Sequence, residues 1–282
     1  MIEIIQTART LASRYDAWLC DVWGVIHNGR SAFPAARQAL DAFKQSGGTV
    51  ILITNAPRPH TEVAAQLVHY DVPASAYDAI VTSGDVTRHL ITAAGDVPIF
   101  HLGPDRDRPV FDGLDVRLVE ADDAELIVNT GLFDDYTETP ENYRDMLGAF
   151  QQRGVRMICA NPDLVVERGE EIVHCAGGLA VLYDELGGHV DYAGKPHGPI
   201  YDLCRARIAD ARGAPADDTR VLAIGDGLKT DIAGANANGI DALFVPSGIH
   251  MRPDDDRDQQ ALDALFADVA RKPIAAIDGL KW

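Results

Sequence analysis

Residues 17–25 read Ala17-Trp18-Leu19-Cys20-Asp21-Val22-Trp23-Gly24-Val25, an apolar stretch that contains one carboxylate and runs into a glycine turn. The apolar run predicts a buried β-strand with Asp21 near its carboxyl end. In an open α/β sheet, ligands bind at the carboxyl ends of the strands. This stretch therefore predicts a central parallel strand and also the place where the chemistry occurs.

Strand-like and helix-like patterns alternate around this stretch and again near the end of the chain. The predicted strands are 17–22, 49–54, 221–225 and 241–245, and the predicted helices are 34–45, 59–70, 196–210 and 230–238. Strand–helix–strand units of this length favour parallel strands joined by right-handed crossovers.

The middle of the chain has an α/β pattern of its own. It predicts strands at 97–102, 125–129 and 156–160, and helices at 140–153 and 178–186. We therefore expect an α/β protein with a Rossmann-like parallel-sheet core and an inserted α/β cap domain. The core would comprise residues 1–80 and 190–282, and the cap residues 81–189.

Composition limits the classes of partner. The chain has 282 residues, of which 46% are hydrophobic, and its net charge is −18. That charge argues against nucleic-acid and anionic-membrane binding, although local cations can still hold a phosphorylated substrate. No apolar run approaches the roughly 20 residues of a membrane-spanning helix. The N-terminus shows no basic region followed by an apolar core, so we expect no signal peptide and a cytoplasmic protein.

Two further features have simple interpretations. The cysteines are far apart and form no CxxC pair, which favours reduced core residues over a disulfide frame or a zinc site; they are Cys20, Cys159, Cys175 and Cys204. The acidic run Asp254-Asp255-Asp256 is typical of a solvated loop.

Four short segments are predicted to lie at strand ends of the core. They are Asp21-Val22-Trp23-Gly24, Ile53-Thr54-Asn55, Gly194-Lys195-Pro196 and Gly225-Asp226-Gly227-Leu228-Lys229-Thr230-Asp231. Each is a weak signal alone, because a Gly-Asp pair can be a turn and a Gly-Lys-Pro can be a surface loop. Together they are a strong signal for one site.

With these four segments the chain resembles the haloacid dehalogenase superfamily. More narrowly, it is similar to subfamily IIA, whose large C2-type cap is inserted between the second and third motifs. That branch includes nitrophenylphosphatases, pyridoxal-phosphate phosphatases and NagD-like nucleotide phosphatases. The resemblance extends into the cap at Asn129-Thr130-Gly131, Cys159-Ala160-Asn161-Pro162-Asp163 and Ala176-Gly177-Gly178.

The resemblance implies a role for each residue. Asp21 would be the nucleophile that forms an aspartyl-phosphate, and Thr54 would donate its hydroxyl to a phosphoryl oxygen. Lys195 would neutralise charge between Asp21 and the phosphoryl group. Mg²⁺ would be held by Asp21, the backbone carbonyl of Trp23, Asp226 and Asp231, since all-oxygen ligands suit this ion.

Other residues near these motifs have two interpretations each. Asn55 either binds phosphate or caps the following segment, and Asn161 either contacts substrate or forms an Asn-Pro-Asp turn with Asp163. His27 is a hydrogen-bonded loop residue or a catalytic acid. Arg58 could meet an anion.

Trp23 is the main departure from the family pattern. In most phosphatases of the superfamily this position carries a second Asp, which protonates the leaving oxygen and then activates water. An indole has one N–H donor and no proton to exchange. Loss of general acid–base catalysis should cost about 10²–10⁴ in rate. The metal ligand is kept, because at this position the metal takes the backbone carbonyl.

Three functions therefore remain open at the level of sequence. The first, which we expect, is Mg²⁺-dependent hydrolysis of a small phosphorylated metabolite, with acid–base help from elsewhere. The second is a slow enzyme or a protein that binds such a metabolite. The third is carbon–halogen hydrolysis, since halide needs no proton and true dehalogenases carry Tyr at this position, but those enzymes use no metal. The sequence does not give the oligomeric state, and a homodimer is one option.

Overall fold

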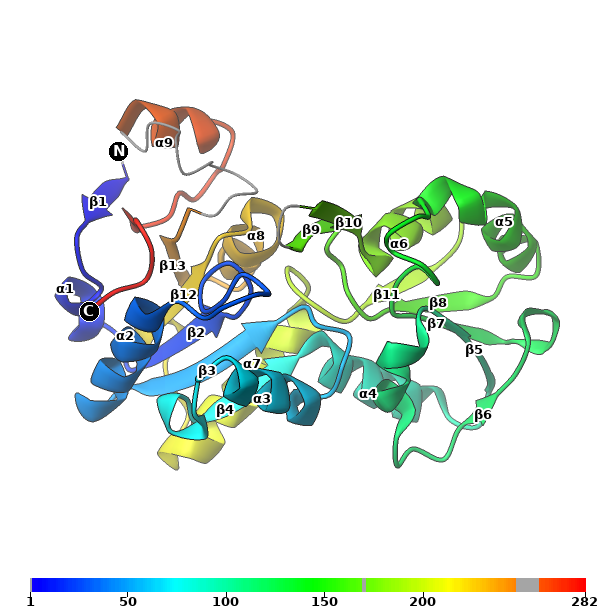
Figure 1. Cartoon of the computed structure of the whole chain (residues 1–282), viewed down its shortest axis with the longest axis horizontal. Coiled ribbons are helices and arrows are strands. Elements are labelled where there is room, and N and C mark those ends of the chain that lie inside the picture. Colours follow the sequence, from blue (N-terminus) through cyan, green and yellow to red (C-terminus); the bar gives the residue numbers. More distant parts are fainter. Residues whose placement is uncertain (1, 169–170, 247–258) are drawn as a thin grey trace. The chain divides into compact units, whose positions relative to one another are not determined.

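The computed structural model describes residues 2–168, 171–246 and 259–282. The chain divides into two compact units. The first comprises residues 1–54, 64–81 and 201–282, and the second comprises residues 55–63 and 82–200. Each unit is built on a sheet of its own, which can be followed by the strand labels in Figure 1.

The first unit contains a seven-stranded sheet in the order β1-β14-β13-β12-β2-β3-β4. Strand β2 (Ala17–Asp21) pairs in parallel with β3 (Thr49–Thr54) on one side and with β12 (Val221–Gly225) on the other. The register sets Asp21 opposite Ile53. The carboxyl ends of these three strands therefore meet at one edge of the sheet. The remaining strands are β1 (Glu3–Ile5), β4 (Ala79–Thr82), β13 (Asp241–Phe244) and β14 (Ala275–Ile277).

Strands β2 and β3 are buried at every position, because helices cover both faces of a parallel sheet. Trp18 of β2 stacks on Phe43 of helix α2 (Pro34–Gln45), with ring centroids 3.9 Å apart. Proline at the first helical turn suits the start of α2. The other helices flanking these strands in sequence are α1 (Arg9–Ala12), α3 (His60–His69), α7 (Gly198–Arg212), α8 (Ala233–Ala237) and α9 (Gln259–Leu265).

The second unit contains a five-stranded parallel sheet in the order β11-β8-β7-β5-β6. Alternate residues of β7 (Leu126–Asn129) point to opposite faces. Ile127 packs in the cluster that contains α5 (Arg144–Gln152) and α6 (Ala176–Glu185), whereas Val128 packs in the cluster that contains α4 (Ser83–Ala94). The other strands are β5 (Pro98–Leu102), β6 (Arg117–Leu118), β8 (Arg156–Cys159), β11 (Val190–Tyr192) and the antiparallel pair β9 (Val165–Arg168) and β10 (Glu171–His174).

The described residues also form several short helical turns. One is a π-helix, η6 (Leu228–Ile232), which precedes α8. The 3₁₀ turns are η1 (Ala74–Ala76), η2 (Asp105–Phe111), η3 (Ala121–Asp123), η4 (Pro140–Tyr143) and η5 (Asp218–Arg220).

The α/β class predicted from the sequence is confirmed, and the predicted strands and helices lie within a few residues of the observed ones. The unit boundaries differ from the expected cap boundaries. Residues 190–192 form β11, which pairs with β8, so this segment belongs to the second sheet and not to the core. Residues 55–63 also group with the second unit. The helix expected to begin at residue 230 begins earlier, through the π turn.

All four cysteines are buried and form no disulfide, as predicted. Among the described helices, each is too short or too polar to traverse a bilayer. Asp254-Asp255-Asp256 lies outside the described residues.

Candidate active site

Asp21 is the last residue of β2, and its side chain is buried. Thr54 is the last residue of the neighbouring strand β3 and is buried as well. Because Asp21 lies opposite Ile53 in the register, Thr54 follows the partner of Asp21 by one position. The two parallel strands thus place a carboxylate and a hydroxyl at adjacent strand ends, as the sequence predicts.

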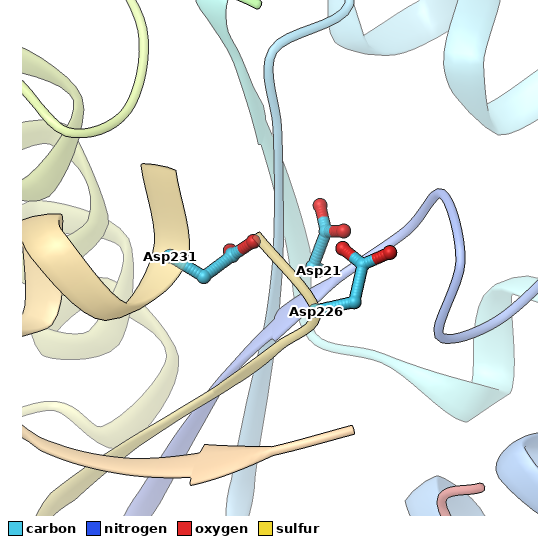
Figure 2. Close-up of side chains that lie close together, drawn as sticks. All are labelled: Asp21, Asp226 and Asp231. Atoms are coloured by element: carbon cyan, nitrogen blue, oxygen red, sulfur yellow. The ribbon is translucent and has the colours of Figure 1, made fainter. Parts of the chain in front are cut away.

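Asp226 and Asp231 come from the segment that follows β12 on the other side of β2. Asp226 follows the last strand residue directly, and Asp231 belongs to the π turn η6. A carboxylate oxygen of each lies within 4.8 Å of the others and of Asp21. Figure 2 shows the three side chains converging from the strand end, the following loop and the helical turn. Asp21, Asp226 and Asp231 expose only 5%, 7% and 5% of their surface.

Three carboxylates this close and this buried need compensation, because burying negative charge is costly. Part of it is visible, since the backbone N–H of Gly227 donates to Asp231 Oδ2 at 3.0 Å. A hard divalent cation would offset more of this charge, and carboxylate oxygens are the ligands that Mg²⁺ and Ca²⁺ prefer. The residues at this edge therefore fit a metal ion.

Gly24 allows the two loops to approach each other. It has φ +84°, and a Cβ there would stand 2.2 Å from Asp226 Oδ2. Any other residue would force Asp226 to move and would strain the backbone. From the sequence alone, Gly24 is explained only as a turn residue. Its close approach to Asp226 is visible only in the tertiary structure.

Lys195 and Asn55 belong to the second unit, where they bond to each other. The backbone N–H of Lys195 donates to Asn55 Oδ1 at 2.7 Å, and Asn55 Nδ2 donates back to the Lys195 carbonyl at 3.2 Å. Asn55 Nδ2 also donates to Asp163 Oδ1 at 3.0 Å. Lys195 is 3% exposed. The side chain of Asn55 therefore holds the backbone around Lys195, a structural role that motif spacing alone could not reveal.

Asn161 forms the turn that the sequence offers as one interpretation. Its Oδ1 accepts a hydrogen bond from the backbone N–H of Asp163 at 3.0 Å, across Pro162. Such a side chain mimics a backbone turn and fixes the loop after β8. Contact of Asn161 or Asn55 with substrate stays a prediction, as does the meeting of Lys195 with the three carboxylates.

The Trp23 side chain packs within its own loop. Its ring meets His27 edge-on at 5.1 Å, and a Cβ on Gly29 would stand 2.6 Å from the indole. The Tyr70 ring also packs against His27, with centroids 4.8 Å apart, and its hydroxyl donates to the Gly29 carbonyl at 2.8 Å. Tyr70 was not singled out by the sequence, because no motif links the end of α3 to this loop. We call Trp23, His27, Gly29 and Tyr70 the Trp23 cluster.

His27 is the core of that cluster and is 1% exposed. Burial lowers its pKa from 6.5 to about 4, so the ring is neutral near pH 7. Nδ1 accepts a hydrogen bond from the Gly29 N–H at 3.0 Å, which places the proton on Nε2. These contacts favour the interpretation of His27 as a loop residue.

Arg58 lies within the second unit, where its Nε stands 3.7 Å from Asp107 Oδ1. The structure thus gives Arg58 a carboxylate partner from its own unit. This ion pair, which joins the segment after β3 to η2, was not predicted from the sequence.

Comparison with known proteins places this arrangement in a family. Residues 18–117 match the model of haloacid dehalogenase-like hydrolases, and residues 192–271 match a second HAD-hydrolase-like model. A haloacid dehalogenase-like hydrolase from Brucella suis 1330 is 45% identical, with a TM-score of 0.87 over 98% of this chain and 100% of its own.

Two other relatives are more distant. The 5'-nucleotidase YutF of Bacillus subtilis is 27% identical over 89% of this chain and 96% of its own length. A glycerol phosphate phosphatase from Mycobacterium tuberculosis, solved in complex with calcium, is 25% identical, with a TM-score of 0.70 over 95% of this chain and 74% of its own. On the strength of the close match over the full length, the chain belongs to the haloacid dehalogenase-like hydrolase family.

Proposed function

We propose that this protein is a Mg²⁺-dependent phosphatase that hydrolyses small phosphomonoesters through an aspartyl-phosphate on Asp21. The observation that carries the proposal is the cluster of three buried carboxylates within 4.8 Å at the ends of neighbouring strands. The 5'-nucleotidase and the glycerol phosphate phosphatase related to this chain add support from their activities.

In this proposal Asp226, Asp231, one oxygen of Asp21 and the backbone carbonyl of Trp23 hold the ion. When bound, Mg²⁺ supplies positive charge to the phosphoryl oxygens and offsets the repulsion among the three carboxylates. An oxygen-only donor set favours Mg²⁺ over zinc or copper.

Asp21 performs the covalent step. The carboxylate oxygen that does not hold the ion attacks phosphorus, the bond from phosphorus to the ester oxygen breaks, and the electron pair leaves with that oxygen. Water then attacks the phosphorus of the aspartyl-phosphate, which releases inorganic phosphate and restores the carboxylate. The Thr54 hydroxyl donates to a phosphoryl oxygen throughout.

Lys195 supplies the remaining positive charge, and Asn55 positions it through the paired backbone hydrogen bonds at 2.7 and 3.2 Å. Asn161 is the candidate for a contact with the remainder of the substrate. Residues 81–189 act as the cap that selects substrates and excludes water, while the phosphoryl chemistry stays with the core.

Trp23 decides which substrates react well. Its indole cannot protonate the departing oxygen, and the neighbouring His27 is neutral with Nδ1 engaged by Gly29. The leaving oxygen therefore departs largely unprotonated, which favours aryl and acyl phosphates over alkyl phosphates.

The test is a phosphatase screen with and without Mg²⁺ on an aryl phosphate, a nucleoside 5'-monophosphate, glycerol 3-phosphate, a sugar phosphate and pyridoxal phosphate. Acid-quenched enzyme should carry a phosphoryl group on the peptide that contains Asp21, detected by mass spectrometry. The matched control for Asp21→Asn is the Asp202→Asn variant. It makes the same change of carboxylate to amide at an exposed residue of α7, where Asp202 pairs with Arg205. Full turnover of these phosphate esters in metal-free protein would overturn the proposed dependence on Mg²⁺.

A second candidate function is a slow protein that binds a phosphorylated metabolite, and Trp23 is the observation that favours it. Calorimetry of the same phosphate esters separates the two functions. Tight Mg²⁺-dependent binding with no phosphoryl transfer to Asp21, even from an aryl phosphate, would establish the binding protein and exclude the enzyme.

A further inference from the structure

A cavity of about 370 Å³ opens in the first unit, and Tyr70 of the Trp23 cluster is one of its lining residues. It is formed by the segment before α2, the first turn of α2 and the end of α3. Its polar lining residues are Arg30, Ser31, Arg37, His69, Tyr70 and Asp71. The volume lies in the range of small-molecule sites, about 300–1,000 Å³.

The two arginines give this cavity a positive lining in a chain with net charge −18. Within residues 2–168, 171–246 and 259–282, neither guanidinium forms an ion pair. Arg37 Nη1 donates to the backbone carbonyl of Asp71 at 3.1 Å, and that contact does not neutralise its charge. Asp71 contributes one carboxylate to the rim, so the lining keeps an excess of positive charge.

Arg37 also carries an unmet hydrogen-bond donor. Its Nε is buried and has no partner among the described residues. A buried donor without a partner costs free energy that an incoming acceptor recovers. A guanidinium presents its N–H groups as a planar fork that matches the paired oxygens of a phosphate or a carboxylate.

Tyr70 completes the lining and connects the cavity to the loop after β2. Its ring packs on His27 at 4.8 Å, and its hydroxyl donates to the Gly29 carbonyl at 2.8 Å. A molecule seated between Arg30 and Tyr70 therefore touches the same segment that carries Gly29. The backbone amides of Gly29 and Ser31 are accordingly sensitive reporters of occupancy.

We propose that this cavity is a binding site for a small dianion that presents paired oxygens to Arg30 and Arg37. The shared chemistry is that of a phosphate ester or a dicarboxylate. The site is distinct from the three catalytic carboxylates, whose negative charge repels such a ligand unless a cation is bound, and it does not depend on the proposed phosphatase activity.

The experiment is an amide NMR titration of the full chain in EDTA, at constant ionic strength. Pyrophosphate serves as the phosphate probe, succinate as the carboxylate probe, and chloride as the ionic control. The variant is Arg30→Gln/Arg37→Gln. The matched control is Arg144→Gln/Arg207→Gln, which removes the same charge from two exposed arginines that pair along their helices.

We expect saturable shifts of the amides of Gly29, Ser31 and Asp71 with at least one dianion. The probe with the lower Kd shows whether the site prefers phosphate or carboxylate oxygens. Arg30→Gln/Arg37→Gln should weaken binding about tenfold or more, whereas the control pair should change it less than about twofold. Ser31→Glu, which places a negative charge in the lining, should abolish the shifts without unfolding an exposed segment.

Three outcomes would overturn the proposal. They are shifts that never saturate, shifts that survive in Arg30→Gln/Arg37→Gln protein with an unchanged circular dichroism spectrum, and shifts confined to the amides of Gly227 and Asn55. The last pattern would place the anion at the catalytic residues instead.

Discussion

The two units share an architecture of parallel strands flanked by helices, yet their strand ends carry different chemistry. In the first, carboxylates gather within 4.8 Å at the ends of β2 and β12. In the second, polar side chains near the strand ends bond within the unit, because His101 bonds to the Thr130 hydroxyl at 2.9 Å and Asn129 donates to the Ala176 carbonyl at 2.9 Å. The same fold class thus gathers three buried carboxylates in one unit and polar side chains bonded within the unit in the other.

This difference shows that the topology provides the location and that the side chains decide its use. A parallel sheet brings strand ends together whatever residues they carry. Among the described residues, the cluster of three buried carboxylates lies in the first unit, and we propose that this unit carries the nucleophile and metal ligands while the second contributes Lys195 and selects the substrate. Four predictions test that division.

The largest effect is expected for Asp21→Asn. An amide fills the same space but cannot attack phosphorus, so kcat should fall by on the order of 10⁴–10⁶-fold with the fold intact. The partner variant at a strand end of the second unit, Asn161→Ala, should raise KM and keep kcat within about tenfold. Steady-state kinetics of both proteins measure the two effects. A loss of kcat in Asn161→Ala as large as that in Asp21→Asn would contradict the proposed division of roles between the units.

The second prediction concerns the leaving group. With Trp23 in place of an acid, kcat/KM should fall with rising leaving-group pKa, and alkyl phosphates should react about 10²–10⁴-fold more slowly than aryl phosphates. Trp23→Asp should reduce the difference in kcat/KM between aryl and alkyl phosphates, provided that the Trp23 cluster keeps the loop in place. A flat dependence on leaving-group pKa in the wild type would mean that another group delivers the proton.

The third prediction uses a pair of glycines with similar backbone angles. Gly24→Ala and Gly47→Ala both place a side chain at positive φ, +84° and +94°, but only the first meets Asp226, while nothing lies within 4 Å of the second. Both should lose about 1–2 kcal/mol of stability. Only Gly24→Ala should also displace a carboxylate of the metal site, which lowers kcat about 10²-fold.

Thermal melts with and without Mg²⁺ provide the check on the glycine pair. The rise in Tm that Mg²⁺ gives to wild type and to Gly47→Ala should be reduced in Gly24→Ala. Equal activity losses in the two variants would show that backbone strain alone, and not contact with Asp226, explains the requirement for Gly24.

The smallest effect is a pH dependence that the two units share. Burial lowers the pKa of His27 in the first unit, and of His101 in the second, from 6.5 to about 4. Between these values the unfolded chain binds more protons than the folded one, so stability falls as the pH drops from 6.5 toward 4. The burial of each histidine should lower the free energy of unfolding by about 2 kcal/mol between pH 7 and pH 5.

Denaturant titrations at several pH values measure this slope. His27→Gln and His101→Gln should each flatten it by a similar amount, although each variant also loses packing. An unchanged slope in His27→Gln would mean that the ring is not neutralised by burial and would reopen its role as a proton donor.

Much of the first unit could be predicted from the sequence. Helix α2 and strand β3 lie at their predicted bounds, because a helical period and an unbroken apolar run are strong local signals. Other elements were not predicted, among them the edge strand β1, its neighbour β14, the helix α4 and the hairpin of β9 and β10. The boundary at residue 190 was placed too early, since pairing of β11 with β8 is a long-range contact.

By itself, then, the sequence determined the fold class and the residue types at the strand ends, because periodicity and composition act over short spans of chain. It also pointed to Asp21, Asp226 and Asp231, whose carboxylate oxygens lie within 4.8 Å of one another in the folded chain. Only the tertiary structure decided that Asn55 holds Lys195, that Gly24 meets Asp226, and that Tyr70 supports the loop of Trp23. Those contacts join residues far apart in sequence, and their partners depend on packing and register, which no local pattern encodes.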